Sequence, residues 1–377
     1  MLKLSFNTCF IITLAFLLSC KTREMQSNQY VFVGTYTDSS HTNGIYIYNF
    51  DENKGTLREI SHTDNIANPS YLALTKDEKY LYAVNENPDT INTVSAFSFD
   101  KEKGTLHFLN KVPANGSAAC FVTVDSTGKV VIESNYGSGN FSVYKTDDEG
   151  KLSSAVQIIQ HIGKSINQNQ SQARAHSTIL SPDERFLFVC DLGNDTLYQY
   201  PFDAKSSKPV DEPHVKTYKI NPGFGPRHLA FAPGGKFVYL LCELEAKVIA
   251  YSFQDDSLTY LQTITSTDIP DSNDKGSAAI RISPDGKILY TSNRGKANDI
   301  AVFKINENGT LDSVAKIKTD KHPRDFNISS DGKFLLVASR DDNTIKVYSI
   351  HADTGKLSYI NQSVSVSKPV SILFNKK

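Results

Sequence analysis

The chain repeats a strand-turn-strand unit about every fifty residues along most of its 377 residues. Six complete copies align on the basic residue of the turn between their first two strands: Lys79, Lys129, Arg185, Lys236, Lys287 and Lys333. Successive members of this series are 50, 56, 51, 51 and 46 residues apart. The turns contain Pro, Asp and Gly, as in SPDGK at 283–287, and β-branched and aromatic runs flank them. Two further apolar segments follow each hairpin, such as 300–305 and 311–317. Four strands per repeat without a helical period predict a β-propeller.

The two ends of the chain complete the circle. Residues 30–35 match the second strand of the other units, and residues 45–50 and 57–60 supply a third and a fourth strand. The missing first strand is found at residues 368–375, whose sequence KPVSILFN resembles 68–74 and 225–231. Pairing of this last strand into the first blade would remove exposed sheet edges. The sequence therefore predicts an all-β, seven-bladed β-propeller, closed by its C-terminal strand, as one domain over residues 30–377.

The N-terminus has the features of an export signal. Lys3 precedes an apolar run at 10–18 that is too short for a transmembrane helix, and the run ends in Leu-Leu-Ser before Cys20. This pattern is similar to a bacterial lipoprotein signal peptide at residues 1–19, with Cys20 as the lipid-bearing residue; a plain secretory signal is the alternative. Residues 20–29 are then a flexible tether. We expect an exported protein that is lipid-anchored at the bacterial cell envelope, facing the periplasm or on the outer membrane.

Composition narrows the class of partner. The formal net charge of the chain is −1, and removal of residues 1–19 with their single Lys leaves 39 basic and 41 acidic residues, so nothing indicates a nucleic-acid partner. The absence of Trp argues against a WD-repeat propeller. Without Cys9 and Cys20, three cysteines remain, Cys120, Cys190 and Cys242, and an odd number cannot complete a disulfide framework. We expect them to be reduced and buried, and the protein to be a monomer.

The register of the repeat shows which residues meet at one mouth of the central channel. Counted from the basic turn residue, position −9 opens the inner strand and position +7 follows the second strand. Because these strands are antiparallel neighbours, both positions lie at the same end. Position −9 holds Ser70, Cys120, His176, Arg227, Ala278, Arg324 and, in the closing strand, Val370. Position +7 holds Tyr36, Glu86, Tyr136, Leu192, Glu243, Arg294 and Arg340.

Four arginines in this set suggest a site for an anion. A guanidinium group can hold a carboxylate or phosphate through two parallel hydrogen bonds, and the chain as a whole is nearly neutral. The alternative is a set of ordinary surface charges. Arg227 and Glu243 face each other in one hairpin, where an exposed pair would contribute only about 0.2–1 kcal/mol. The other end of the channel carries repetitive Asp-Gly-Lys turns instead, which favours the anion site.

Short motifs in a fixed order carry a family resemblance. They are VGTYT at 33–37, GIY at 44–46, NPSYL at 68–72, AH at 175–176, GPRH at 225–228, Glu243, SNR at 292–294 and HPR at 322–324. In this order the chain resembles, over roughly residues 30–375, the seven-bladed lactonase family that includes bacterial 6-phosphogluconolactonase and the fungal carboxy-muconate cyclising enzyme. Single motifs are common, but their order and blade placement are specific. The resemblance implies that His176, Arg227, Glu243 and Arg294 form the catalytic group.

The family's chemistry would be hydrolysis of a sugar lactone. Glu243 or His176 would activate a water molecule, and Arg227 or Arg294 would neutralise the oxyanion or hold an acidic group of the substrate. A neighbouring arginine should keep Glu243 ionised but weaken it as a base. The reference pKa of about 6.5 favours His176, and the choice of base stays open. The remaining mouth residues are predicted to bind substrate: Arg324, Arg340, Glu86, Tyr136 and Tyr36.

The predicted substrate is a small anionic sugar lactone, either 6-phospho-D-glucono-1,5-lactone or a relative such as a uronic acid lactone. Export favours the relative, because phosphorylated gluconolactone belongs to cytosolic metabolism. Two alternatives stay open: a muconate-lactonising cycloisomerase type of enzyme and a non-catalytic propeller that binds a glycan or a protein. No cofactor or metal is predicted, since the chain has no H-E-x-x-H, C-x-x-C, Walker or G-x-S-x-G motif. The turn residues Asp77, Asp183, Asp285 and Asp331 fall one per blade and could not share one calcium ion; an ion on the axis is left open.

Overall fold

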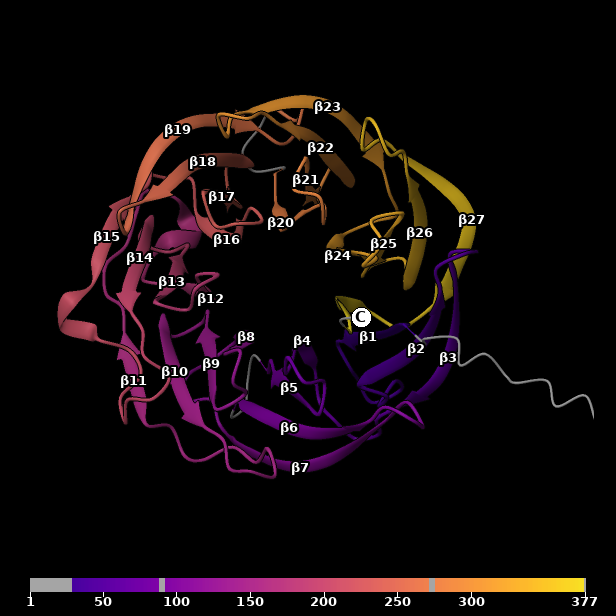
Figure 1. Ribbon diagram of the computed structural model, residues 1–377, viewed down its shortest axis with the longest axis horizontal. Coiled ribbons are helices and arrows are strands. Elements are labelled where there is room, and N and C mark those ends of the chain that lie inside the picture. The colour runs from indigo at the N-terminus through magenta and orange to yellow at the C-terminus, as the bar shows by residue number, and fades with distance from the viewer. Residues whose placement is uncertain (1–28, 88–91, 271–274, 376–377) are drawn as a thin grey trace, which may run out of the picture.

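Seven four-stranded antiparallel sheets surround one axis (Figure 1) in the computed structural model, which describes residues 29–87, 92–270 and 275–375. The predicted fold class and blade number are therefore confirmed. Two short 3-10 helices, η1 (Gln168–Gln170) and η2 (Glu212–His214), are the helices of this described part, and none of its helices is long and apolar enough to cross a membrane. The predicted signal peptide and Cys20 lie outside the described residues. Gln29, predicted as the end of the tether, instead opens strand β1.

Each blade follows the chain from the axis to the rim, and blades are numbered from the one that contains β1. From blade 1 to blade 7, the inner strands are β28 (Pro369–Phe374), β4 (Pro69–Leu74), β8 (Ala119–Val124), β12 (Ala175–Leu180), β16 (Pro226–Phe231), β20 (Ser277–Ile282) and β24 (Pro323–Ile328). The second strands are β1 (Gln29–Thr35), β5 (Tyr80–Asn85), β9 (Val130–Asn135), β13 (Phe186–Asp191), β17 (Phe237–Cys242), β21 (Ile288–Asn293) and β25 (Phe334–Ser339).

The two outer strands of each blade follow in the same order. The third strands are β2 (Ile45–Asp51), β6 (Thr93–Asp100), β10 (Asn140–Lys145), β14 (Thr196–Pro201), β18 (Lys247–Gln254), β22 (Asp299–Ile305) and β26 (Thr344–Ile350). The fourth strands form the rim: β3 (Thr56–His62), β7 (Thr105–Pro113), β11 (Gln157–Gln160), β15 (Lys216–Lys219), β19 (Ser257–Thr265), β23 (Leu311–Lys318) and β27 (Leu357–Ser365).

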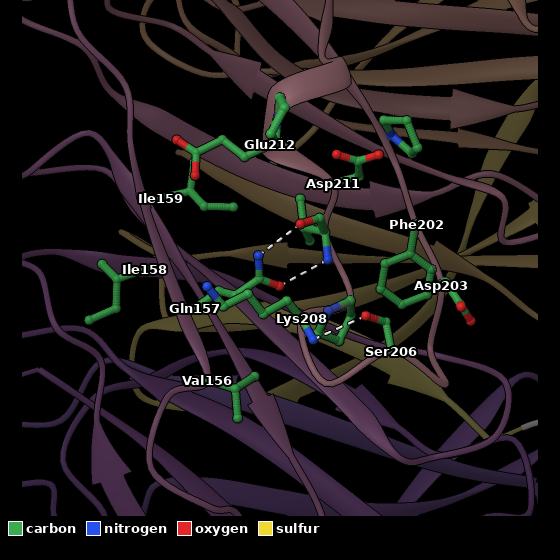
Figure 2. Close-up of a pocket in the computed structure, with 14 residues that line it drawn as sticks. Val156, Gln157, Ile158, Ile159, Phe202, Asp203, Ser206, Lys208, Asp211 and Glu212 are labelled. Atoms are coloured by element: carbon green, nitrogen blue, oxygen red, sulfur yellow. Dashed lines mark hydrogen bonds between the residues drawn. The ribbon is translucent and has the colours of Figure 1, made fainter.

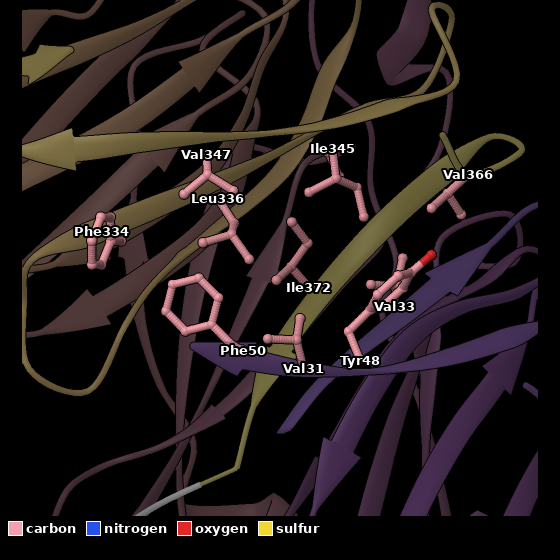
Figure 3. Packing of buried hydrophobic residues seen from close by; sticks show 11 residues of the cluster. Val31, Val33, Tyr48, Phe50, Phe334, Leu336, Ile345, Val347, Val366 and Ile372 are labelled. Carbon is pink, nitrogen blue, oxygen red and sulfur yellow. The ribbon is translucent and has the colours of Figure 1, made fainter. Parts of the chain in front are cut away.

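The C-terminal strand closes blade 1, as predicted. Strand β28 pairs antiparallel with β1, with Ile372 opposite Val33. Ile372 also packs in an apolar cluster between blades 7 and 1, together with Leu336 and Val347 (Figure 3). The closing strand thus stabilises the propeller through buried apolar surface and through backbone hydrogen bonds. Both contributions are lost if β28 separates from β1.

The acidic turn residues stabilise their own hairpins. In blade 6, Asp285 Oδ1 accepts hydrogen bonds from Ser283 Oγ at 2.6 Å and from the backbone N–H of Lys287 at 3.2 Å. The equivalent side chains in blades 2, 4 and 7 do the same: Asp77, Asp183 and Asp331. This local bonding is the typical role of Asp in a tight turn.

Every inner strand has a β-bulge where it opens at the channel mouth. In β16, Pro226 pairs with Cys242 and His228 pairs with Leu241, so Arg227 has no partner on β17. The same irregularity leaves the −9 residue unpaired in five other blades: Val370, Ser70, Cys120, His176 and Arg324. In β20 it spans Ala278 and Ala279. A bulge changes the direction of a side chain, so this feature, which the sequence did not predict, orients the residues of the mouth.

Candidate active site

The first ionic cluster of the mouth has Glu243 between two arginines. Its Oε1 lies 2.7 Å from Arg294 Nη2, and its Oε2 lies 2.8 Å from Arg227 Nε, in a contact that is ionic without hydrogen-bond alignment. The Arg227 side chain is 3% exposed and that of Arg294 is 11% exposed. Burial raises the pKa of Glu243, but the two guanidinium charges outweigh burial and hold that pKa below its usual value. Glu243 is therefore ionised, as the sequence predicted.

The second ionic cluster joins blades 1, 2 and 7. Tyr36 donates its hydroxyl to Glu86 Oε2 at 2.7 Å, and Arg324 Nη2 lies 3.5 Å from the same oxygen. The Arg324 guanidinium carbon lies 5.4 Å from the centre of the Tyr36 ring. Burial raises the pKa of Tyr36, and the Glu86 carboxylate raises it further, so this phenol stays protonated and remains a donor.

His176 lies among aromatic rings next to these charges. Its imidazole meets the rings of Tyr136 and His228 edge to face, at centroid distances of 5.5 and 5.3 Å. Burial, followed by the positive charges of Arg227 and Arg324, lowers the pKa of His176 well below 6.5. In the free protein His176 therefore does not titrate near neutral pH, contrary to the prediction made from the reference pKa. The imidazole is neutral over the physiological range and is a weaker base than in water.

Backbone carbonyls at the bulges link neighbouring blades. Cys120 donates its thiol to the carbonyl of His176 at 3.3 Å, and Ser177 donates its hydroxyl to the carbonyl of Arg227 at 2.8 Å. Arg227 in turn donates from Nη1 to the carbonyl of Ala278. Burial raises the pKa of the Cys120 thiol, which therefore acts as a protonated donor. Cys120, Cys190 and Cys242 are all free and buried, as expected.

The remaining predicted residues lie around these groups. Arg340 directly follows β25, its Nε lies 2.7 Å from Asp341 Oδ1, and its side chain is 32% exposed. With Tyr36 and Glu86 it lines a cavity of about 750 Å³, whose other lining residues are Asn68, Ala118, Asp341, Asn343 and Lys368. The structure thus gathers all nine predicted catalytic and binding residues at one mouth.

Sequence reasoning missed Arg174 and His228, which contact the predicted residues, because it compared positions −9 and +7 alone. Arg174 occupies position −11, and its guanidinium carbon lies 4.8 Å from the centre of the Tyr136 ring. His228 occupies position −8, and its Nε2 lies 3.2 Å from Arg227 Nη1. The Pro that precedes position −9 in four blades was a usable signal for the bulge, since Pro has no N–H and suits the first residue of a strand: Pro69, Pro226, Pro323 and Pro369.

The contact of His228 with Arg227 fixes its tautomer. A guanidinium group can only donate, so Nε2 accepts and the hydrogen of the neutral ring is on Nδ1. Burial, then the charge of Arg227, lowers the pKa of His228 well below 6.5, which agrees with a neutral ring. Nδ1 is buried and has no hydrogen-bond partner among the described residues. His228 therefore positions Arg227 and presents one unsatisfied donor.

A layer of side chains crosses the channel one to three residues further along the inner strands. The ring of Tyr71 stacks on Phe121 with centroids 4.2 Å apart. From the opposite side, Arg281 Nη2 lies 3.1 Å from Asp325 Oδ1 and 3.5 Å from the Tyr71 hydroxyl. His228 meets both aromatic rings edge to face. The candidate site therefore has an aromatic and ionic floor.

Another cavity, of about 800 Å³, lies at the outer edge of blades 3 and 4 (Figure 2). The carboxamide of Gln157 crosses it, donating to the carbonyl of Val210 at 2.8 Å and accepting from the Val210 N–H at 2.9 Å. No predicted site residue lines this cavity. It is therefore not the candidate active site.

The fold and the mouth together define a seven-bladed propeller with a charged, partly buried site around a neutral histidine. The protein family described as "Lactonase, 7-bladed beta-propeller" matches residues 30–374, and the chain belongs to this family. The family resemblance inferred from the short motifs is thus confirmed.

Named relatives agree with this membership. The chain is 34% identical to a 6-phosphogluconolactonase of Formosa agariphila over 347 residues, which cover 91% of this chain and 98% of that protein. A solved structure from Bacteroides fragilis, whose assignment as a 6-phosphogluconolactonase is provisional, is 37% identical, with a TM-score of 0.89 and coverage of 94% and 99%. The structure of a periplasmic gluconolactonase of Pseudomonas aeruginosa is 29% identical, with a TM-score of 0.86 and coverage of 93% and 99%. These similarities identify the chain as a lactonase-type enzyme and support hydrolysis of sugar lactones as its general activity.

Proposed function

We propose that the chain hydrolyses a small anionic sugar lactone, either 6-phospho-D-glucono-1,5-lactone or a related lactone that carries a carboxylate. The observation that carries this proposal is the carboxylate of Glu243 held between Arg227 and Arg294, close to the neutral imidazole of His176. A neutral base and fixed cations are what addition of water to a carbonyl requires. The names of the relatives support the same chemistry.

In the proposed reaction, water adds to the lactone carbonyl carbon and His176 takes one proton from it. The carbonyl oxygen becomes an oxyanion, which Arg294 or Arg227 stabilises. The tetrahedral intermediate then collapses, the bond from the carbonyl carbon to the ring oxygen breaks, and the proton held by His176 passes to that oxygen. The product is the open hydroxy acid, and the enzyme returns to its starting state.

His176 is a better candidate for the base than Glu243, because each oxygen of Glu243 is already held by an arginine. His176 has no carboxylate partner within ion-pair distance in the described part of the chain. In the free protein, the positive charges of nearby arginines lower the pKa of His176. A bound anionic substrate would offset these charges, so the pKa of His176 should rise in the complex. Glu243 then orients the two guanidinium groups and keeps them charged.

The test is acid release from the phosphorylated and unphosphorylated gluconolactones, measured above the spontaneous rate with the purified chain. We expect His176→Asn to lower kcat by roughly 10²- to 10⁴-fold and to remove the acidic limb of the pH–rate profile. Glu243→Gln should retain that limb. Unchanged kcat in His176→Asn would overturn the assignment of the base. Isomerisation of a carboxylated muconate without uptake of water would replace lactonase by cycloisomerase, and ligand binding without any turnover would leave a binding propeller.

We also propose that the protein is exported and anchored by a lipid on Cys20, as its N-terminal sequence suggests. A structural neighbour described as a periplasmic gluconolactonase supports export. Cells expressing the full chain and Cys20→Ala would be labelled with a radioactive fatty acid. We expect label in the natural chain and none in Cys20→Ala. Equal label in both proteins, or no label in the natural chain, would contradict the lipid anchor.

A further inference from the structure

Arg174 differs from the other arginines of the mouth in having no carboxylate partner among the described residues. Arg227 and Arg294 share Glu243, Arg324 faces Glu86, and Arg340 is paired with Asp341. The Nε of Arg174 donates to the backbone carbonyl of Asn169 at 2.7 Å, and its two terminal nitrogens have no protein hydrogen-bond partner in that part of the chain. Its positive charge is available to a ligand.

The guanidinium of Arg174 lies close to the proposed reaction centre. It sits 4.8 Å from the centre of the Tyr136 ring, and that ring is 5.5 Å from the imidazole centre of His176, so the guanidinium lies within about 10 Å of His176. Burial and the Glu243 carboxylate raise the pKa of Tyr136 while Arg174 lowers it, which agrees with Tyr136 lying near both charges. A ligand that reached from His176 to Arg174 would pass over the face or edge of Tyr136.

Buried polar groups fix the backbone of Arg174. His161 Nδ1 lies 2.8 Å from Asp191 Oδ2, and its Nε2 lies 3.0 Å from the Tyr200 hydroxyl. The other oxygen of Asp191 accepts the backbone N–H of Arg174 at 2.7 Å. Asp191 is fully buried and His161 is 4% exposed, so this connection holds the long segment 161–174 onto blade 4. Asp191 therefore fixes the backbone of Arg174, and the hydrogen bond from Nε to the carbonyl of Asn169 holds the side chain.

We propose that Arg174 binds the anionic group of the substrate, at the end of the sugar opposite the uncharged lactone carbonyl. The substrate class is a hexonolactone with a phosphate or a carboxylate at carbon 6. This inference rests on the proposed lactonase function for the position of the carbonyl. In the proposed complex, one sugar ring lies between His176 and Arg174. Water adds to the carbonyl at the His176 end, and the Arg174 guanidinium holds the distal anion through two hydrogen bonds.

The test measures binding by calorimetry of three open-chain acids that need no turnover: gluconate, 6-phosphogluconate and glucarate, which has a second carboxylate. We expect Arg174→Gln to weaken 6-phosphogluconate or glucarate binding roughly 10- to 100-fold, the range for a charge-assisted hydrogen bond, and to leave gluconate binding unchanged. Arg174→Lys should fall between Gln and the natural residue. Arg185→Gln is the matched control, since Arg185 belongs to the same blade at the other end of the channel and lies 5.2 Å from the Phe186 ring.

The outcomes separate this inference from the proposed function. A loss confined to 6-phosphogluconate identifies phosphate as the distal group, and a loss confined to glucarate identifies a carboxylate. Three results would overturn the inference. In Arg174→Gln, the affinity for gluconate could fall as much as that for the doubly charged acids, or no affinity could change. The natural chain could also bind a doubly charged acid no more tightly than gluconate. If Arg174 discriminates between the acids but no lactone is hydrolysed, the distal anion site stands and the lactonase proposal falls.

Discussion

Replacement of Glu243 by Gln is expected to destabilise the protein more than any exposed charge change at the same mouth. The variant removes the counter-charge of Arg227, whose side chain is 3% exposed, and of Arg294, which is 11% exposed. Burial already lowers the pKa of Arg227 to about 10 although Glu243 opposes this shift. Removal of one partner of a buried ion pair costs about 3–5 kcal/mol. Because the Glu243 side chain is 21% exposed and Gln still offers an acceptor, we expect the lower end, about 3 kcal/mol.

The assay is urea unfolding at pH 7.5 and low salt, with and without inorganic phosphate. A bound anion stabilises the folded state by RT ln(1 + c/Kd), where c is the anion concentration. Because Glu243→Gln frees both arginines to bind phosphate more tightly, phosphate should stabilise the variant more than the natural chain. Asp341→Asn is the control, since its partner Arg340 is 32% exposed and such a pair contributes at most about 1 kcal/mol. The natural chain should also lose stability as the pH falls through the lowered pKa of Glu243, and the variant should lose less.

Two results together would refute this reasoning. The free energy of unfolding of Glu243→Gln would lie within about 0.5 kcal/mol of that of the natural chain, as for ordinary surface substitutions, and phosphate would stabilise both proteins equally. The cluster would then be only a set of exposed ion pairs. That was the alternative raised by the sequence, and in that case the mouth would not be a preorganised anion site.

Further predictions concern pH, closure and metals. Burial lowers the pKa of His176 and His228 in the folded protein. Below about pH 6.5 the unfolded chain therefore binds protons that the folded protein does not. The free energy of unfolding should fall on acidification below this pH, by up to about 1.4 kcal/mol per pH unit for each histidine. Urea unfolding at pH 7.5 and 5.5 should show a smaller drop in His228→Asn, and equal drops would contradict the pKa directions. The acidic limb of kcat should lie at higher pH than that of kcat/KM, since a bound anion offsets the arginine charges; coincident limbs would argue against this effect. Ile372→Ala, at the closing strand, should lower the free energy of unfolding by about 2–5 kcal/mol, whereas an unchanged urea midpoint would show that closure adds little. Exhaustive chelation should leave hydrolysis unchanged, and recovery only on adding a divalent cation would contradict the expectation of no metal.

The sequence by itself determined the architecture. The period of the turns gave the number of blades, and the unmatched strands at residues 30–35 and 368–375 gave the closure that pairs β1 with β28. The same register placed His176, Arg227, Glu243 and Arg294 at one mouth. These features follow from local rules, because turn chemistry and strand alternation act between residues close in sequence and repeat in every blade.

Only the tertiary structure decided how these residues interact. The register already placed Arg227 opposite Glu243 in one hairpin. Arg294 reaches Glu243 from the next blade, and Arg324 reaches Glu86 from blade 7 to blade 2, and these two contacts depend on packing between sheets. Burial and neighbouring positive charges lower the pKa of His176 well below the reference value on which the sequence-based expectation relied. The bulges and the support from Asp191 placed Arg174 and the −9 side chains. Position along a repeat is encoded locally, but burial and the distance between charges are properties of the assembled ring, and they set the chemistry of the site.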